Sequence, residues 1–321
     1  MTRPLIVVAP NAFKETFSPR EAARLIARGL RLTIDARIEL VPVADGGDGT
    51  LEALRASLGG RLVSTRVTGP LGKPIRASYL RAGRTAVIEM ARASGLRHVP
   101  LPERNPLRTT SRGTGEQILH AWNAGARRIL LGVGGSATVD GGAGALAVLT
   151  PGIVRHVTVL CDVENPLLGP RGAAPVFGPQ KGATPAIVRK LQRRLRGWAE
   201  FLRARTGVDV RWMKGAGAAG GMAGGFAAFG AKLVPGAAYI LKAAGFPRPC
   251  DAVVTGEGCV DRTSLGGKAV GTVIRLSPAP VFLVCGRCLL PRRAFETGGR
   301  SAAALVAAAG RAGRHIAALL A

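Results

Sequence analysis

Two aspartates in a short glycine-rich segment are spaced for binding a metal ion. Asp45 and Asp48 lie within the segment 44–50, which also contains Gly46 and Gly47. Mg²⁺ in proteins prefers a few carboxylate ligands together with phosphate oxygens, and a tight loop of this kind can provide the carboxylates. A turn without a ligand is the alternative, because aspartate and glycine are common turn residues. We favour the metal-binding interpretation.

A third aspartate, Asp140, lies in a loop dominated by small residues. The apolar run 129–133 is typical of a buried strand, and Gly134, Gly135 and Ser136 follow it. Glycine lets backbone N–H groups approach an anion closely, and the start of a following helix adds the positive end of its dipole. The loop therefore suits a phosphate group, with Asp140 placed to hold a metal or to orient a hydroxyl. A tight turn without a ligand stays open, because no stricter phosphate motif is matched.

Charged residues also follow two apolar runs, 5–9 and 252–255, that we expect to be strands. They are Lys14 after the first run, and Glu257, Asp261 and Lys268 after the second. Open α/β sheets bind ligands at the carboxyl ends of their strands, so these residues are candidates for a binding site. A solvated side chain is the alternative for Lys14.

Two further glycine-rich regions contain polar candidates. Loops dense in glycine and proline after the run 157–160 hold Asp162, Asn165, Gln180 and Lys181. The segment 214–230 contains a G-x-G-x-x-G match, formed by Gly215, Gly217 and Gly220. No strand clearly precedes this match, so it indicates a dinucleotide site only weakly. Close approach to a phosphate and close helix packing both stay open.

We identify no covalent nucleophile. The four histidines lie far apart, and Ser136 is followed by Ala137 and Thr138, so the G-x-S-x-G motif is absent from the sequence. The five cysteines are odd in number and scattered, which argues against a disulfide framework. Cys285 and Cys288 have the spacing of a redox motif, but spacing alone is weak, and we interpret it as chance.

Composition limits the class of protein. The chain has 321 residues, enough for two domains, with 47% hydrophobic and 4% aromatic residues. The formal charge of +26 favours anionic partners, but the basic residues are spread along the whole length. We favour a generic basic surface over a nucleic-acid site. No apolar run approaches the roughly 20 residues of a spanning helix, and no signal peptide is recognisable, so we expect a soluble, cytoplasmic protein.

The apolar pattern predicts an α/β fold that positions these candidates. The expected parallel strands are 5–9, 38–43, 252–255, 281–284 and 303–307, and a meander of short strands covers 61–90. Ser18, Pro19 and Glu21 form a capping-box sequence that predicts the start of a helix. Thr184 and Pro185 predict the start of a second helix, whose many basic residues indicate a solvated face.

Carboxylates, lysines and glycine loops, without a histidine cluster or a catalytic thiol, are the groups that phosphoryl transfer uses. In chain order the sequence contains P-N-A-F-K, V-A-D-G-G-D-G-T, V-T-G-P-L-G, R-N-P-L-R-T-T-S-R-G-T-G-E, G-V-G-G-S-A-T-V-D-G-G-A-G, C-D-V-E-N-P-L-L-G-P, V-F-G-P-Q-K-G-A, G-A-G-A-A-G-G and V-T-G-E-G. In these motifs and their order the chain resembles the type-1 glycerate kinase family over nearly its whole length.

The resemblance implies ATP-dependent phosphorylation of D-glycerate with Mg²⁺, giving 2- or 3-phosphoglycerate. It also implies an α/β fold in which both chain ends form a flavodoxin-like (Rossmann-like) parallel-sheet domain, with a second α/β mixed-sheet domain inserted. We place the first domain at 1–62 plus 246–321 and the inserted domain at 63–245, with the active site in the cleft between them. The expected partners are glycerate and the nucleotide, without a specific nucleic acid or a membrane. A monomer or a homodimer is expected.

The resemblance and the candidates together suggest residue roles. Catalytic roles are assigned to Lys14, Asp45, Asp48, Asp140, Glu257 and Asp261. The candidate metal ligands among them are Asp45, Asp48 and Glu257, and the sequence leaves open which carboxylate is the base. Substrate or phosphate binding is assigned to Gly46, Gly47, Gly134, Gly135, Ser136, Asp162, Asn165, Gln180, Lys181, Gly215, Gly217, Gly220 and Lys268. Lys14 and Lys181 would neutralise phosphate or carboxylate charge.

The chain departs from the family pattern at four places. Val139 stands where the family usually has asparagine, Cys259 where arginine is usual, and Asn11-Ala12 where Asp-Ser is common. The connection 149–156 is also shorter than usual. These departures concern substrate preference more than activity.

The sequence leaves three alternatives open. A kinase for another small hydroxy acid is the nearest. A basic nucleic-acid-binding protein would associate with DNA or RNA in a steeply salt-dependent way and would not turn over ATP. A nicotinamide dehydrogenase would need an acidic residue roughly 20 positions after the 215–220 glycines, and 236–244 contains no aspartate or glutamate.

The role assignments predict that turnover falls in the variants Lys14→Ala, Asp45→Asn and Asp48→Asn, because each removes a charge from the expected phosphoryl-transfer site. The measurement is the turnover number for glycerate phosphorylation with ATP and Mg²⁺. Wild-type turnover in all three variants would show that the assignment is wrong.

Overall fold

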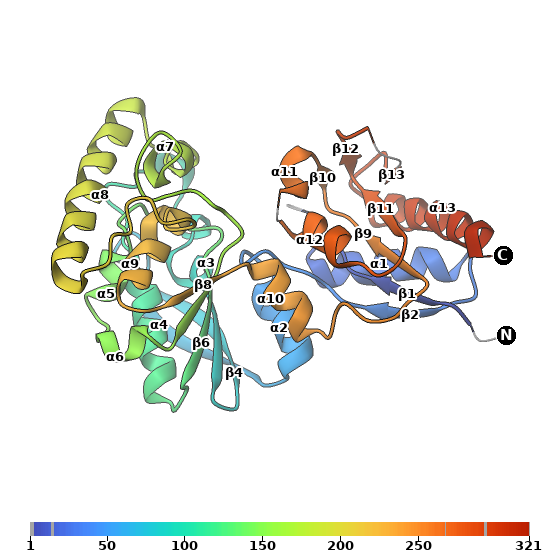
Figure 1. Ribbon diagram of the computed structural model, residues 1–321, viewed down its shortest axis with the longest axis horizontal. Helices are drawn as coiled ribbons and strands as arrows, with labels where there is room; N and C mark the ends of the chain where they lie inside the picture. Colours follow the sequence, from blue (N-terminus) through green and yellow to red (C-terminus); the bar gives the residue numbers. More distant parts are fainter. Residues whose placement is uncertain (1–2, 14–15, 267, 292–293, 321) are drawn as a thin grey trace. The chain divides into compact units, whose positions relative to one another are not determined.

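The computed structural model describes residues 3–13, 16–266, 268–291 and 294–320, and it divides the chain into two compact units. Unit 1 comprises Met1–Asp45, Glu52–Ser57 and Ala237–Ala321, and unit 2 comprises Gly46–Leu51 and Leu58–Gly236. Unit 1 therefore contains residues from both ends of the chain (Figure 1). The boundaries proposed from the sequence were 1–62 with 246–321, and 63–245.

Unit 1 is built on a five-stranded sheet whose strands all pair in parallel, in the order β13-β11-β9-β1-β2. The strands assigned to this unit, including a separate two-stranded ladder of β10 with β12, are β1 (Leu5–Val8), β2 (Arg37–Leu40), β9 (Ala252–Thr255), β10 (Cys259–Val260), β11 (Val281–Cys285), β12 (Arg287–Cys288) and β13 (Ala294–Glu296). The helices that lie wholly or mainly in this unit are α1 (Pro19–Arg31), α2 (Thr50–Leu58), α10 (Gly236–Ala243), α11 (Arg262–Leu265), α12 (Ala269–Leu276) and α13 (Ala302–Leu320).

Alternate residues of the central strands enter two hydrophobic cores, one on each face of this sheet. Ile6 and Val8 of β1 pack in a cluster with residues of α1 and α13. Val7 packs in a second cluster with residues of α10 and α12. Side chains alternate between the faces of a strand, so helices on both sides explain why these strands are continuous apolar runs.

Helix α1 begins as its sequence predicts. Ser18 Oγ accepts from the Glu21 backbone N–H at 3.3 Å, and a Glu21 carboxylate oxygen accepts from the Ser18 N–H at 2.9 Å. This capping box satisfies two backbone donors, and Pro19 occupies the first turn.

The prediction of a strand at 303–307 is wrong, because these residues lie in helix α13. The buried positions of α13 include Leu305, Ala308, Ala309, Ala312 and Ile316, whose spacing of three and four is helical. Alanine also has the highest helix propensity, so the alanine-rich run continues through the expected strand. The outermost strand beside β11 is β13, and it precedes the helix.

Unit 2 contains a six-stranded mixed sheet in the order β3-β4-β5-β6-β7-β8. Its strands are β3 (Arg61–Thr68), β4 (Pro74–Ala82), β5 (Thr85–Glu89), β6 (Arg128–Gly132), β7 (Val157–Leu160) and β8 (Lys232–Val234). The β3-β4 and β4-β5 pairs are antiparallel, which confirms the predicted meander, and the remaining pairs are parallel. The fold is thus the α/β class expected from the sequence, with one parallel and one mixed sheet.

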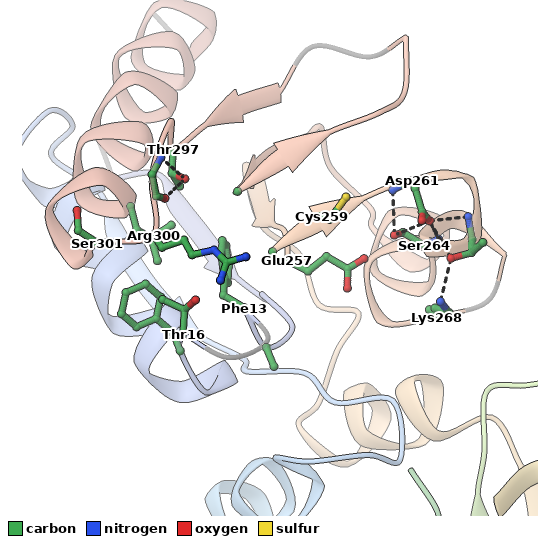
Figure 2. Close-up of a pocket in the computed structure, with 17 residues that line it drawn as sticks. Phe13, Thr16, Glu257, Cys259, Asp261, Ser264, Lys268, Thr297, Arg300 and Ser301 are labelled. Atoms are coloured by element: carbon green, nitrogen blue, oxygen red, sulfur yellow. Dashed lines mark hydrogen bonds between the residues drawn. The ribbon is translucent and has the colours of Figure 1, made fainter. Parts of the chain in front are cut away.

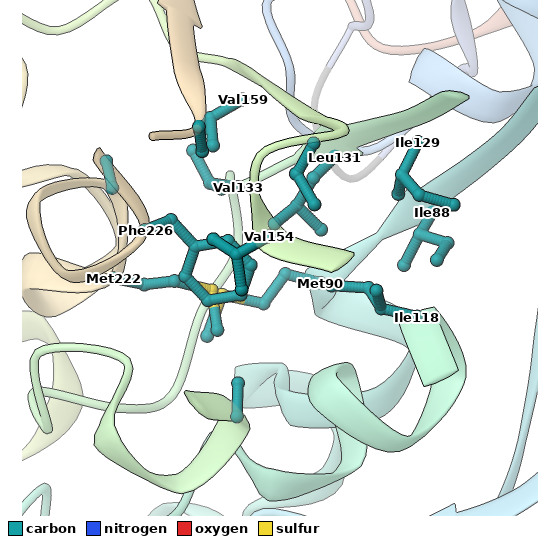
Figure 3. Close-up of a cluster of buried hydrophobic side chains, with 14 of the residues drawn as sticks. Ile88, Met90, Ile118, Ile129, Leu131, Val133, Val154, Val159, Met222 and Phe226 are labelled. Carbon is teal, nitrogen blue, oxygen red and sulfur yellow. The ribbon is translucent and has the colours of Figure 1, made fainter. Parts of the chain in front are cut away.

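Helices cover the mixed sheet and close its core. The helical segments of unit 2 are α3 (Met90–Ser94), η1 (Leu96–His98), η2 (Leu101–Glu103), α4 (Arg112–Asn123), α5 (Ala143–Leu146), α6 (Pro151–Val154), α7 (Ala173–Phe177), η3 (Pro179–Lys181), α8 (Pro185–Thr206), η4 (Ala218–Gly221) and α9 (Met222–Ala228). Figure 3 shows Met222 and Phe226 of α9 in the core with Val133 and Val154. Within the described ranges we find no helix with the length and apolar character to cross a bilayer.

Helix α8 also begins at the predicted residues. Thr184 Oγ1 accepts from the Ile187 backbone N–H at 3.3 Å, and Pro185 occupies the first turn. The helix ends at Gly207, whose φ of 76° is left-handed and favours glycine.

Two glycines inside helices of unit 2 should respond oppositely to replacement by alanine. A Cβ at Gly225 of α9 would lie 2.1 Å from the carbonyl oxygen of Gly141, whereas a Cβ at Gly197 of α8 would meet nothing within 4 Å. We expect Gly225→Ala to lower the free energy of unfolding by about 1–3 kcal/mol through overpacking. Gly197→Ala should raise it by up to about 1 kcal/mol through helix propensity. Urea unfolding measures both, and equal effects of the two variants would contradict the packing of α9.

Candidate active site

A cavity of about 410 Å³ lies at the carboxyl edge of the parallel sheet of unit 1 (Figure 2). Its lining comes from the segments that follow β1, β9 and β11, together with the residues that precede α13. The carboxyl ends of parallel strands meet at one edge of a sheet, so segments far apart in the chain converge here. Three of the sequence candidates line this cavity: Glu257, Asp261 and Lys268.

The carboxyl group of Glu257 is the most enclosed charge of the cavity. Its side chain is 9% exposed, and Asn11 Nδ2 donates to its Oε2 at 3.3 Å. Burial raises the pKa of Glu257, and the negative charge of Asp45 raises it further. Hydrogen bonds from Ser264 and Asn11 and the positive charge of Lys268 oppose this rise. The group is thus set to take up a proton or to bind a cation more readily than an exposed glutamate.

Asp261 caps the short helix α11. Its Oδ1 accepts from the backbone N–H groups of Thr263 at 2.8 Å and Ser264 at 3.0 Å, and from the Thr263 hydroxyl at 2.7 Å. The hydrogen bonds from Thr263 and Ser264 lower the pKa of Asp261. Lys268 Nζ donates to the same Thr263 hydroxyl at 2.9 Å. Asp261 therefore orders the loop that carries Lys268, and as a base it is weaker than Glu257.

Sequence reasoning missed the side of the cavity that precedes α13. Arg300, Thr297 and Ser301 line it, and Figure 2 shows the Arg300 guanidinium directed into the cavity, with Glu257 between it and Lys268 in this view. The signal was present, since a polar T-G-G-R-S segment precedes an alanine-rich helix. Assigning 303–307 to a strand concealed it, because the start of the helix went unrecognised.

The two aspartates of the segment 44–50 have different surroundings. Asp45 belongs to unit 1, is half-buried and lies near enough to Glu257 to raise its pKa. Asp48 belongs to unit 2, is exposed and forms an ion pair with Arg97. The candidate Lys14 lies outside the described residues.

Asp140 ties two loops of unit 2 together. Its Oδ2 accepts from the Ser111 backbone N–H at 2.9 Å and from the Ser111 hydroxyl at 2.7 Å. The backbone N–H groups of Gly142 and Gly144 also donate to the carboxylate, at 3.1 and 3.3 Å. These contacts place the negative charge at the start of α5, where it satisfies backbone donors.

Lys181 points into the protein. Its side chain is 2% exposed, and Nζ donates to Ser136 Oγ at 2.8 Å and to the Thr138 carbonyl oxygen at 2.7 Å. Burial lowers the pKa of Lys181 to about 7, while the negative charge of Asp140 acts in the opposite direction. In this arrangement Lys181 fixes the loop that contains Ser136.

The other candidates of unit 2 lie in loops that pack on one another. A Cβ at Gly134 would lie 2.4 Å from Gly47 Cα, and one at Gly217 would lie 2.3 Å from the Pro166 carbonyl oxygen. A Cβ at Gly220 would lie 2.0 Å from the Thr138 carbonyl oxygen. Close contact between backbones therefore accounts for these three glycines.

The remaining candidates have varied surroundings. Gly46, Gly135 and Gly215 have positive φ values of 84°, 70° and 81°. Asn165 Nδ2 donates to the Arg171 carbonyl oxygen at 2.8 Å, Gln180 is exposed, and Asp162 is half-buried after β7. Over the described ranges, no three or more His, Cys, Asp or Glu side chains form a group that could hold a metal ion. Among the predicted ligands, the negative charge of Asp45 acts on Glu257 and raises its pKa.

Comparisons with known proteins identify the same family over most of the chain. A family model described as the glycerate kinase family matches residues 6–155 and 154–318. The chain is 41% identical to the glycerate 2-kinase of Escherichia coli strain K12, over 88% of this chain and 84% of that protein. It is 41% identical to a glycerate kinase of Bacillus subtilis strain 168, with the same coverage. A crystal structure titled as a putative glycerate kinase 2 from Salmonella typhimurium LT2 matches with a TM-score of 0.81 and 36% identity, over 99% of this chain and 98% of that one.

The lowered pKa of Lys181 predicts that the stability of the protein rises with pH. Between pH about 7 and 10.5 the unfolded chain holds a proton on this lysine that the folded protein has released. The free energy of unfolding should therefore rise across this window, by at most about 1.4 kcal/mol per pH unit, and this contribution should stop changing below pH about 7 and above pH about 10.5. Urea unfolding of wild type and Lys181→Met at several pH values isolates the effect as a difference.

The matched control for this measurement is Lys190→Met, on an exposed position of α8. It should keep the wild-type pH dependence, whereas Lys181→Met should lose the rise. The same slope in wild type and Lys181→Met would contradict the burial of an ionisable amine at this position.

Proposed function

The chain belongs to the glycerate kinase family, and on that basis we propose that it transfers the γ-phosphoryl group of ATP to the 2-hydroxyl of D-glycerate, giving 2-phosphoglycerate. It is an enzyme of the phosphotransferase class, as its relatives are. The Escherichia coli relative is named a glycerate 2-kinase, and its 41% identity supports the 2-position.

The observation that supports a location for the acceptor is the charged cavity of unit 1. Glycerate is small, carries one carboxylate and offers two hydroxyls. Arg300 directs a guanidinium into the cavity, and this group suits the carboxylate because it can form two parallel hydrogen bonds. In this proposal the hydroxyls of glycerate then lie toward Glu257.

Glu257 is the proposed base. Its pKa is raised toward neutral pH. A general base is most effective when its pKa lies near the operating pH, because it is then both deprotonated and able to bind a proton. As the 2-hydroxyl oxygen attacks the γ-phosphorus, its proton passes to Glu257 Oε, and the bond from phosphorus to the β,γ-bridging oxygen of ATP breaks. Lys268, close enough to lower the pKa of Glu257, supplies positive charge on the same side of the cavity.

Glu257 in the cavity wall and Asp45, whose charge acts on it, fit Mg²⁺. Asp45 and Glu257 repel one another, and a divalent cation would relieve that repulsion. Asp45 would hold the ion together with phosphate oxygens of the nucleotide, which matches the preference of Mg²⁺ for few protein ligands. When bound, the ion neutralises charge on the phosphates. We do not include Asp48 in this set, because its carboxylate pairs with Arg97.

The first test identifies the product. Purified protein, ATP, Mg²⁺ and D-glycerate are expected to yield 2-phosphoglycerate, recognised by phosphorus and carbon NMR from the position of the phosphorylated carbon. Lactate and tartronate in place of glycerate test for other hydroxy acids. Preference for either, or exclusive formation of 3-phosphoglycerate, would contradict the proposal.

A second test concerns the base. Glu257→Gln should lower kcat by about 10²–10⁴-fold, the usual contribution of a general base. Glu200→Gln, an exposed change on α8, should leave kcat at the wild-type value. A wild-type kcat in Glu257→Gln would remove this residue from the reaction.

The pH profile gives a third test with a defined sign. Because the base must be deprotonated, kcat/KM should fall on the acidic side with an apparent pKa above 4.5. Lys268→Met removes a positive neighbour of Glu257 and should move this limb to higher pH. A shift to lower pH in this variant would show that Glu257 does not control the limb.

A further inference from the structure

A pair of thiols, Cys285 and Cys288, lies in a segment next to the cavity. Cys285 ends β11, Cys288 ends β12, and β12 pairs with β10 in parallel, so that Val260 lies opposite Cys288. Cys285 and Cys288 pack in one apolar cluster with Val260. The pair that sequence spacing alone left as chance therefore lies in one packed cluster.

The two thiols differ in access to solvent. Cys285 is fully buried, whereas Cys288 is half-buried and its thiol contacts the Leu290 carbonyl oxygen at 3.8 Å. Burial raises the pKa of Cys285 to about 12, and the neighbouring Cys288 and Glu296 act in the same direction. An external reagent can therefore reach Cys288 first. Cys285, which is buried and protonated, can react only with a sulfur that lies beside it.

The segment between the thiols is hydrogen-bonded to the wall that carries Glu257. The Gly286 N–H donates to the Glu257 carbonyl oxygen at 3.2 Å, and the Arg287 N–H donates to the Gly258 carbonyl oxygen at 3.1 Å. On the other side, the Cys285 carbonyl oxygen accepts from the Thr297 N–H at 2.9 Å. Gly286, Glu257, Gly258 and Thr297 all line the cavity. A change in the backbone of 285–288 would therefore displace two of its walls.

We propose that Cys285 and Cys288 are a modification site, a dithiol that a low-molecular-weight disulfide converts to a reversible intramolecular disulfide, and that closure of this bond impairs the adjoining cavity. The Cys288 thiolate attacks one sulfur of the external disulfide and expels a thiolate, which leaves a mixed disulfide. Cys285 then attacks the Cys288 sulfur, losing its proton as the second external thiol departs. Two protein thiols are oxidised by two electrons in total, and one external disulfide is reduced to two thiols.

Loss of activity follows from geometry. A disulfide holds its two sulfurs about 2 Å apart and so constrains the backbone of 285–288. That segment is hydrogen-bonded to the backbone of Glu257. Misplacement of a catalytic group by about 1 Å can cost about 10²-fold in rate, so we expect kcat/KM to fall by about tenfold or more.

The test begins with the thiols themselves and does not depend on activity. Full-length protein is incubated with oxidised glutathione, the remaining thiols are alkylated, and the protein is cleaved with trypsin without reduction. Cleavage after Arg287 separates peptides 276–287 and 288–292, each with one cysteine of the pair. We expect both cysteines to escape alkylation, with the two peptides joined, or recovered as one uncut peptide lighter by two hydrogens. Alkylation of both, or a bond from Cys288 to Cys259, would overturn the site.

Activity and variants complete the test. Oxidation should lower kcat/KM of the wild type by about tenfold or more, and dithiothreitol should restore it. Cys288→Ser and Cys288→Ala should keep the reduced wild-type activity and become insensitive to oxidised glutathione, whereas Cys250→Ser, away from the pair, should stay sensitive. Full activity of wild type in which the mapped disulfide is present would overturn the link to the cavity. Absence of any glycerate phosphorylation by reduced protein would contradict the proposed function, while the peptide mapping still decides the disulfide.

Discussion

The parallel pairing of the strands of unit 1 is the constraint on which the site depends. Residues that follow β1 and β9 meet because these strands are neighbours, and Asn11 reaches Glu257 across 246 positions of the chain. The enclosure of Glu257 follows from the same pairing, since each flanking strand contributes a loop to the cavity wall. Desolvation is the largest cause of its raised pKa, and an isolated loop in water would not provide it. The chemistry proposed for this carboxyl is thus a property of the sheet edge.

Charged groups in unit 2 serve a different purpose. Lys181 and Asp140 are turned toward backbone and hydroxyl groups, and together they connect the loop containing Ser136 to its neighbours. A buried ammonium is costly unless hydrogen bonds compensate, and Lys181 has two acceptors. Such contacts hold the glycine-rich loops in one conformation. The excess positive charge of the chain, by contrast, is spread along its length.

The cysteine pair is a weak signal in the sequence, and its structural surroundings are what make it informative. Two cysteines at the spacing of Cys285 and Cys288 occur often by chance. Their meaning here comes from the ladder of β10 with β12, which attaches the segment between them to the backbone beside Glu257. A modification of this pair is thereby linked to the cavity through main-chain hydrogen bonds.

Local patterns were sufficient for much of the secondary structure. The capping residues at Ser18 and Thr184, the apolar strands and the meander before β6 depend on neighbours within a few positions, and the sequence predicted them. The same local reasoning misassigned 303–307, because a short apolar run has no period long enough to distinguish a strand from a helix. The family could also be recognised from motif order alone, as the comparisons bear out.

Within the site, Glu257, Asp261 and Lys268 were found from the sequence because charged residues after a strand are a local signal. The sequence by itself determined these residue types and the strands before them. Only the tertiary structure decided that Glu257 is enclosed, that the Asp261 carboxylate caps helix α11, and that Arg300 faces the cavity. The physical reason is that burial and electrostatic coupling depend on distances through space, and the order of strands in a sheet sets these distances independently of separation along the chain.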